Sequence, residues 1–185
     1  IPEEIQPSTP GDQGNSEKTI RLIKSMTLEE KVGQLVMVGV DGYETDTHSE
    51  LLIKNYHVGG FILFKKNIKD SVQLSSLLNS LKALNASSNK VPLFLSVDEE
   101  GGRVSRLPDE IKKIPSCKEI GNKNDSDLSY KVGAILGKEL HAFGFNMNFA
   151  PVLDINSNPK NPVIGDRAFG NTPALVSRLG VQTMK

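Results

Sequence analysis

The sequence alternates short apolar runs with longer stretches in which apolar residues recur every three or four positions. Each short run has the length and composition of a buried β-strand, and each longer stretch has the period of an amphipathic helix. The expected strands cover residues 35–40, 58–64, 93–97 and 145–155. The helices expected after them cover residues 45–56, 70–84, 125–143 and 172–185. Alternation of this kind predicts a parallel sheet with helices packed on it.

Polar residues at the expected helix ends support these boundaries. Ser16 can cap a first helix, and Thr27 with Glu30 has the spacing of a capping box for a second, short one. Thr172-Pro173 is typical of the start of the last helix. Residues 107–124 hold two prolines and no clear period, so an irregular connection is expected there.

Four strand–helix units fit two architectures, a small doubly wound sheet or the first half of an eight-stranded (β/α)₈ barrel. A complete barrel typically needs about 250 residues, and this chain has 185. The segment after the first strand has only Gly39 and Gly42, so it lacks the glycine-rich fingerprint of a dinucleotide site. The residues alone leave both architectures open.

Composition narrows the function classes and the location. The 22 basic residues balance the 22 acidic ones, which argues against a nucleic-acid partner, and no apolar run is long enough to span a bilayer. Cys117 is the single cysteine, and neither it nor any histidine has metal-ligand spacing. Residues 1–15 are rich in Pro, Gln, Ser and Gly, which predicts a flexible leader. Such a leader fits a secreted or surface protein tethered behind a removed export signal; a cytoplasmic location is the alternative.

The third strand ends in the densest group of chemically useful residues, Asp98-Glu99-Glu100-Gly101-Gly102-Arg103. Parallel α/β folds collect their functional groups at the carboxyl ends of strands. A carboxylate at such a position can accept hydrogen bonds from two neighbouring sugar hydroxyls, which makes Asp98 the strongest candidate. The guanidinium groups of Arg103, Arg106 and Arg167 can donate to sugar oxygens or clamp a carboxylate.

Structural roles compete with these interpretations. Arg103 or Arg106 can form an ion pair with Glu99 or Glu100, and Asp166 can orient Arg167. A metal-dependent alternative would use the oxygens of Asp98, Glu100 and Asp154.

Several motifs, in order along the chain, are similar to those of glycoside hydrolase family 3. Met26 to Leu35 (MTLEEKVGQL) and Gly59 to Phe64 (GGFILF) resemble the opening of that family. Val97 to Val104 (VDEEGGRV) resembles its β-N-acetylglucosaminidase branch, which more usually has glutamine at the position of Glu99. Phe149 to Asp154 (FAPVLD) and Gly165 to Gly170 (GDRAFG) follow in the same order.

The resemblance implies an α/β fold of the (β/α)₈ type, with residues 16–185 holding the first four or so units as the N-terminal half of the barrel. It implies a retaining hydrolase that removes terminal β-linked N-acetylglucosamine, often from peptidoglycan fragments. By motif position, Asp98 and Arg167 would bind sugar hydroxyls and Arg106 would help to line the pocket. The residues that would hold these side chains in position without contacting the sugar are Glu100, Arg103, Asp154 and Asp166.

The branch's Lys-His pair, its His-Asp acid/base dyad and its Asp nucleophile lie further along than the GDRAFG motif. No catalytic residue is therefore expected in this chain, which alone would be inactive and would need the remaining half of the barrel as its partner. No cofactor and no metal are expected. A non-catalytic carbohydrate-binding half barrel and a β-glucosidase-type specificity are the alternatives.

Overall fold

The computed structural model describes residues 10–185, with side chains described from Glu17 onward. Helix α1 (Pro10–Ser25) begins before Ser16, which was expected to cap it, so residues 10–15 of the predicted leader are helical. Residues 1–9 of the predicted leader lie outside the described residues. No helix in the described part of the chain is both long and apolar enough to cross a membrane.

The described strands form one parallel sheet in sequence order. They are β1 (Met37–Gly39), β2 (Gly60–Leu63), β3 (Phe94–Val97) and β4 (Met147–Asn148). In the register, Leu63 lies opposite Val97, and Val97 lies opposite Asn148. The order β1-β2-β3-β4, each strand beside the next, is that of a partial barrel, whereas in a doubly wound sheet the order reverses at a switch point. This confirms the α/β barrel-type fold expected from the resemblance.

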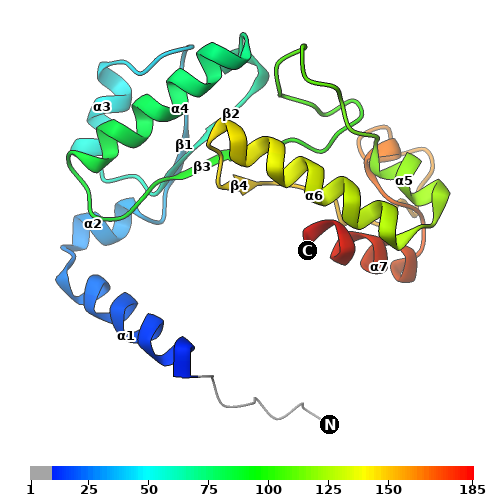
Figure 1. Cartoon of the computed structure of the whole chain (residues 1–185), viewed down its shortest axis with the longest axis horizontal. Coiled ribbons are helices and arrows are strands. Elements are labelled where there is room, and N and C mark those ends of the chain that lie inside the picture. The colour runs from blue at the N-terminus through cyan, green and yellow to red at the C-terminus, as the bar shows by residue number, and fades with distance from the viewer. Residues whose placement is uncertain (1–9) are drawn as a thin grey trace.

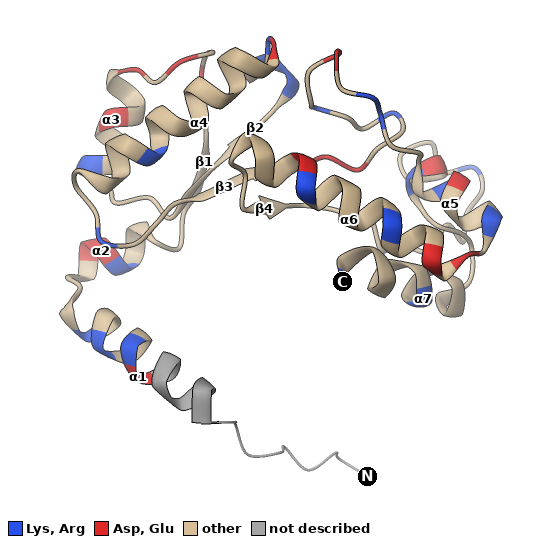
Figure 2. Cartoon of the chain, viewed as in Figure 1, with Lys and Arg blue, Asp and Glu red and all other residues tan. Residues whose placement is uncertain are grey.

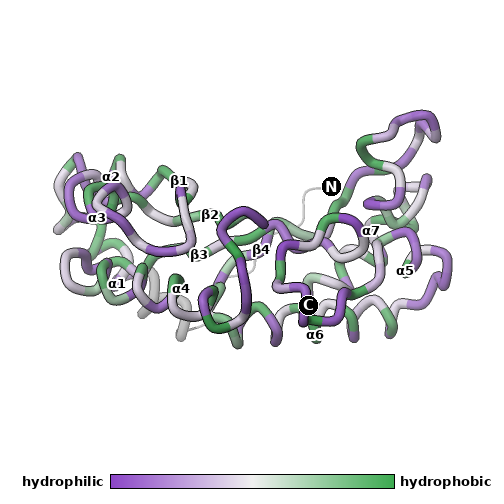
Figure 3. The backbone as a smooth tube through the Cα atoms, turned by 90° about the horizontal axis from the view of Figure 1, so that it is seen from above, coloured by the Kyte–Doolittle hydropathy of each residue, from purple (hydrophilic) through white to green (hydrophobic). Residues whose placement is uncertain are grey.

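Helices follow the strands as the alternation predicts. They are α2 (Leu28–Gly33), α3 (Thr47–Lys54), α4 (Ser71–Ala86), α5 (Cys117–Lys123), α6 (Ser126–Phe143) and α7 (Pro173–Met184), with short 3₁₀ turns η1 (Lys65–Asn67) and η2 (Gly165–Arg167). Figure 1 shows α3 and α4 beside β1 and β2, with α5 and α7 beyond β4. The view from above keeps the same two groups apart (Figure 3). Basic and acidic residues are interspersed along most of the helices (Figure 2).

Local signals in the sequence account for most helix starts. The capping box at α2 is complete, because the Thr27 side chain accepts from the Glu30 N–H while the Glu30 carboxylate accepts from the Thr27 N–H. Helix α4 begins after Asp70, whose carboxylate accepts from the Gln73 N–H at 2.8 Å. Helix α7 begins at Pro173 as expected, although the Thr172 side chain makes no capping bond.

Two expectations about the chain were wrong. The stretch 107–124 is not wholly irregular, since it contains α5, which starts with a capping box between Ser116 and Glu119. The fourth strand is far shorter than the expected residues 145–155. Only Met147 and Asn148 pair with β3, and the chain then leaves the sheet before Pro151, which has no N–H to donate to a ladder.

The apolar side chains form two clusters. The first core joins the sheet to α4 and includes Phe61, Leu63, Leu74, Leu77, Leu78, Leu81, Leu95 and Val97. The second core lies among α5, α6, α7 and the loop before α7, and consists of Cys117, Ile120, Val132, Phe169, Val176 and Leu179. Ile114 packs against both clusters. The third strand and the loop after η2 are therefore anchored in different cores.

Helices α6 and α7 pack closely at a glycine. A β-carbon on Gly133 would lie 2.1 Å from the carbonyl oxygen of Thr183. One turn earlier, the Ser129 hydroxyl donates to the Leu179 carbonyl at 2.8 Å. The absence of a side chain at position 133 thus allows the second core to close.

We predict that Gly133→Ala destabilises the full-length protein by about 1–3 kcal/mol, because the added methyl group forces the two helices apart. The check is urea denaturation of both proteins. Gly42→Ala is the control, because its β-carbon meets nothing within 4 Å, and its effect should stay within about 0.5 kcal/mol. Equal effects of the two substitutions would contradict the close packing.

Candidate functional site

The loop that follows β3, residues 98–107, forms the centre of the candidate site. The chain reverses direction there, with the Glu100 N–H donating to the Val104 carbonyl and the Val104 N–H donating to the Gly101 carbonyl. Gly101 and Gly102 have φ values of 83° and 55°, in the left-handed region that favours glycine. A β-carbon on Gly101 would also lie 2.7 Å from the Pro115 carbonyl oxygen. The two glycines therefore let the carboxylates of residues 98–100 emerge in different directions from one turn.

Glu100 forms a two-pronged ion pair with Arg167. The Arg167 Nε and Nη2 atoms donate to the two carboxylate oxygens at 2.8 and 2.6 Å. The Glu100 side chain is 2% exposed, so this pair is largely removed from water. Hydrogen bonding to Glu100 raises the pKa of Arg167 above its ordinary value. The pair fixes η2 against the end of β3 and brings together two motifs that are far apart in the sequence.

Asp98 lies beside this pair and contacts Arg106. The Arg106 Nη2 atom lies 3.4 Å from a carboxylate oxygen of Asp98, and about a quarter of each side chain is exposed. Burial and the nearby charge of Glu100 raise the pKa of Asp98, outweighing the attraction of Arg106 and Arg167. Asp98 is therefore a partly open carboxylate with incompletely satisfied charge, as a hydroxyl-binding group would be.

Arg103 reaches outward from the same loop to the segment before η2. Its Nε atom pairs with Asp166 at 2.8 Å, and its Nη2 atom donates to the carbonyls of residues 162–164. Asp166 thus orients Arg103, so the interpretation in which it orients Arg167 was wrong. Neither Arg103 nor Arg106 forms an ion pair with Glu99 or Glu100, because Arg103 pairs with Asp166 and Arg106 with Asp98.

Other polar residues near the strand ends, including the predicted Asp154, take structural or peripheral places. Asp154 is exposed and contributes only a distant charge that raises the pKa of Arg167. Asn67 is buried after β2, where it donates to the carbonyls of Val40 and Gly42 and ties the ends of β1 and β2 together. Lys65 pairs with Asp109 at 2.7 Å.

Two asparagines of the β4 segment were missed in the sequence. The Asn148 side chain accepts from the Glu99 N–H and donates to the Glu99 carbonyl, each at 3.0 Å. Asn146 brackets the backbone of β3 in the same way, through the Leu95 N–H and the Leu93 carbonyl. The alternation of asparagine with apolar residues at 145–149 is the signal that could have revealed them.

Two buried side-chain polar atoms lack a hydrogen-bond partner within the described part of the chain, and both belong to this region. They are Arg106 Nε and Asn156 Oδ1. Buried polar groups are normally paired, and unpaired ones tend to mark functional positions. No three acidic, histidine or cysteine side chains of residues 17–185 come together as a metal site would require. Asp98, Glu100 and Asp154, the ligands of the metal-dependent alternative, form no such group.

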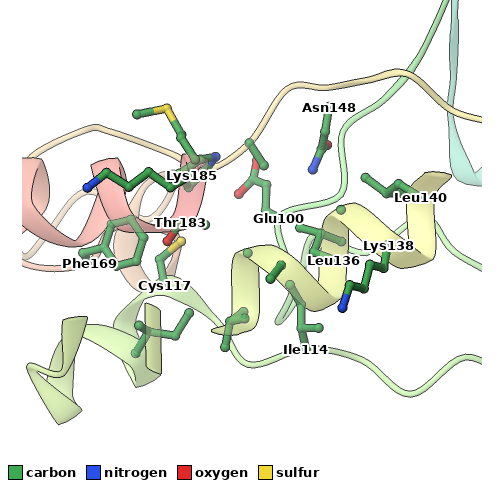
Figure 4. A pocket seen from close by; sticks show the side chains of 18 of the residues that line it. Glu100, Ile114, Cys117, Leu136, Lys138, Leu140, Asn148, Phe169, Thr183 and Lys185 are labelled. Atoms are coloured by element: carbon green, nitrogen blue, oxygen red, sulfur yellow. The ribbon is translucent and has the colours of Figure 1, made fainter. Parts of the chain in front are cut away.

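A cavity of about 810 Å³ lies behind the site, between β4 and the helices α6 and α7. Its walls are mainly apolar and include Ile114, Cys117, Leu136 and Phe169 (Figure 4). Glu100 lines the same cavity, so one carboxylate faces both the ion pair and the hollow. Burial raises the pKa of Cys117 to about 11, which suits a structural thiol and not a nucleophile.

We predict that Glu100→Gln destabilises the full-length protein by about 3 kcal/mol, since it leaves the Arg167 charge without its buried partner. Glu50→Gln removes the exposed ion pair of Glu50 with Lys54 on α3 and should cost no more than about 1 kcal/mol. Chemical denaturation at neutral pH measures both. A loss at Glu100 as small as that at Glu50 would mean that the buried pair does not hold the loop.

Comparison with known proteins places this geometry in a family. The model of the glycosyl hydrolase family 3 N terminal domain matches residues 27–185. Beta-hexosaminidase A of Pseudoalteromonas piscicida is 41% identical over 139 residues, which are 72% of this chain and 23% of that protein. Beta-hexosaminidase of Thiobacillus denitrificans is 37% identical over 155 residues, covering 80% of this chain and 42% of that protein.

Solved structures agree with this placement. A glycoside hydrolase family 3 β-N-acetylglucosaminidase from Paenibacillus sp. is 46% identical, with a TM-score of 0.83 over 86% of this chain and 30% of that one. NagZ from Neisseria gonorrhoeae, solved in complex with N-trifluoroacetyl-D-glucosamine, is 31% identical, with a TM-score of 0.72 over 80% of this chain and 44% of that one. The chain thus spans less than half the length of these relatives. It belongs to glycoside hydrolase family 3 and corresponds to the N-terminal domain of that family's enzymes.

Proposed function

We propose that this chain is part of a hydrolase that removes terminal β-linked N-acetylglucosamine, and that it supplies one side of the sugar pocket. The observation that carries the proposal is Asp98, a partly exposed carboxylate at the carboxyl end of β3. It is flanked by the guanidinium groups of Arg106 and Arg167. A carboxylate between two fixed donors can accept and orient a pair of sugar hydroxyls.

The chemical step needs a carboxylate nucleophile on one side of the anomeric carbon and an acid/base on the other. The neighbouring carboxylates of this loop are already engaged. Glu100 is bound to Arg167, and Glu99 accepts hydrogen bonds from backbone N–H groups. The resemblance to the family implies that the nucleophile and the acid/base of a retaining mechanism lie beyond this chain, so we expect the chain alone to be inactive.

Names of relatives support the substrate class. The matched proteins are called beta-hexosaminidases and β-N-acetylglucosaminidases, and the NagZ complex holds an N-acylated glucosamine. Fragments of bacterial peptidoglycan carry this sugar, and they are the substrate we favour. A location outside the cytoplasm stays a prediction, supported by the composition of residues 1–15 alone.

We predict that Asp98→Asn in the full-length protein lowers kcat/KM for an aryl N-acetyl-β-glucosaminide by about 100-fold, because each charge-assisted hydrogen bond to a hydroxyl is worth about 1.5–3 kcal/mol. Its thermal stability should not fall at pH 7. The raised pKa of Asp98 means that its charged form is less favourable in the folded protein than in the unfolded chain. Wild-type Asp98 therefore lowers stability as the pH rises through its folded pKa, and the difference between the proteins should vanish below about pH 4.

Asp109→Asn is the matched control, because that carboxylate is exposed and pairs only with Lys65. Unchanged kinetics in Asp98→Asn would remove Asp98 from the site, and an unfolded variant would make it structural. Turnover of the aryl β-glucoside in place of the N-acetylated substrate would favour the β-glucosidase alternative. Sugar binding by the wild-type protein without turnover would favour the non-catalytic one.

We also propose that the cavity beside β4 receives a further parallel strand from the remaining half of the barrel. Within the described sheet β4 pairs only with β3, so its other side is a free edge. Gly137 of α6 faces this cavity, and a β-carbon there would meet nothing within 4 Å. Glycine inside a helix costs about 1 kcal/mol relative to alanine. If another backbone approaches α6 closely at Gly137, as α7 does at Gly133, this would explain why a glycine is present at position 137.

Whether a strand fills the cavity determines the sign of the stability change that one substitution, Gly137→Leu, should cause. If a strand fills the cavity, Gly137→Leu destabilises the full-length protein by about 1–3 kcal/mol through overpacking. If the cavity is open to water, the same change is neutral or stabilising, since leucine is the better helix former. Lys131→Leu, at an exposed position of α6, controls for the added surface leucine. Urea denaturation of the three proteins decides between the two signs.

A further inference from the structure

Glu99 is the one residue of the 98–107 loop whose carboxylate is buried without an ion-pair partner among the described residues. It is 2% exposed. Its carboxylate oxygen Oε2 accepts from the Arg106 N–H at 2.5 Å and from the Leu107 N–H at 3.0 Å. One side chain at the start of the loop therefore holds the backbone at its end.

The backbone of Glu99 is itself fixed from the neighbouring strand. The amide side chain of Asn148 bonds to both its N–H and its carbonyl. The backbone of Glu99 is thus held in place after the end of β3, and its carboxylate binds the backbone at the other end of the loop. A loop closed in this way has little freedom to move the residues that it carries.

Burying a carboxylate without a counter-ion is unfavourable unless hydrogen bonds replace the lost water. The charged groups that share the small space behind Glu99 are Lys112 and Lys113 of the following segment and Glu139 of α6. Burial and the negative charge of Glu99 raise the pKa of Glu139. Glu99 forms no ion pair with any of these groups among the described residues, so the backbone N–H groups of Arg106 and Leu107 are the partners that compensate its burial.

The role of Glu99 follows from the side chain that the closed loop positions, which is that of Arg106. The Arg106 N–H that Glu99 binds belongs to the residue whose guanidinium reaches Asp98 at 3.4 Å. We propose that Glu99 is a positioning residue, which sets Arg106 against Asp98 and so shapes the sugar-hydroxyl site. The proposal rests on the function proposed above for Asp98.

The geometry also explains what the position requires. The two backbone N–H groups need an oxygen acceptor at the end of a side chain of this length. A glutamine at this position would offer one such oxygen, although without the charge that strengthens the hydrogen bonds. Glu99→Gln should therefore keep the loop closed, whereas Glu99→Met keeps the length of the side chain but loses the acceptor.

The test uses the full-length protein with four variants: Glu99→Gln, Glu99→Met, Arg106→Gln and the double variant Glu99→Met/Arg106→Gln. For an aryl N-acetyl-β-glucosaminide, Glu99→Gln should lie within about threefold of wild type in KM, since it keeps its acceptor. Glu99→Met should raise KM about tenfold or more with a smaller change in kcat, the size expected for one misplaced polar contact. The double variant should be no worse than Glu99→Met, because Arg106 is already displaced.

Wild-type KM in Glu99→Met, or fully additive effects in the double variant, would overturn the proposal. A lower melting temperature with unchanged KM would also overturn it, because it would assign Glu99 a purely structural role. Amide hydrogen exchange supplies a readout that needs no activity. The amides of Arg106 and Leu107 should be protected in the wild type and in Glu99→Gln, and rapid exchange of both in the wild type would overturn the proposal even if Glu99→Met does not fold. A wild-type protein that neither hydrolyses nor binds the sugar, but protects both amides, would refute the proposed function and leave the loop closure standing.

Discussion

The buried ion pair between Glu100 and Arg167 is the constraint on which the site depends. Glu100 lies in the loop just after β3, and Arg167 lies in η2, so the pair joins the end of the sheet to the segment that precedes α7. A buried pair of this kind adds little net stability compared with apolar packing, but it is costly to break. Its value here is geometric, because it fixes one guanidinium next to Asp98.

Each of three carboxylates in this region has one arginine as its ion-pair partner among the described residues. Glu100 engages Arg167, Asp166 engages Arg103, and Asp98 makes only a long contact with Arg106. In the first two pairs, the carboxylates of Glu100 and Asp166 bind arginines and so hold the 98–107 loop against η2. Asp98 has a partly exposed carboxylate without a short ion pair, and the burial that raises its pKa is also what would strengthen a hydrogen bond to a ligand.

Much of the fold could be predicted from the sequence because its signals are local. The capping box of α2 and the strand run 93–97 depend on neighbouring residues and were identified correctly. Helix α5 was missed although Ser116 and Glu119 carry the same capping signal, because the prolines around it suggested an irregular segment. The fourth strand was expected to be too long because the apolar residues of 145–155 continue past Pro151, and the bonds of Asn146 and Asn148 to the β3 backbone were not recognised.

The members of the site could be predicted, but their partners could not. Asp98, Arg106 and Arg167 lie close together after β3, as their motif positions indicate, and their binding of a sugar stays a prediction. Which carboxylate faces which guanidinium depends on the direction in which each side chain leaves the turn at Gly101 and Gly102, and residue spacing does not encode that direction. The role of Glu99 was open for the same reason, since its partners are backbone groups at the far end of the loop.

The two separate apolar cores have a consequence for cooperativity. Asp98 follows the last strand residue of the first core, whereas Arg167 is followed by Ala168 and Phe169, which are buried on the side of the second core. A ligand held by both side chains would connect the two clusters, which also share α6 and Ile114. It would stabilise the state in which both clusters are packed, and so would reduce local opening in each of them.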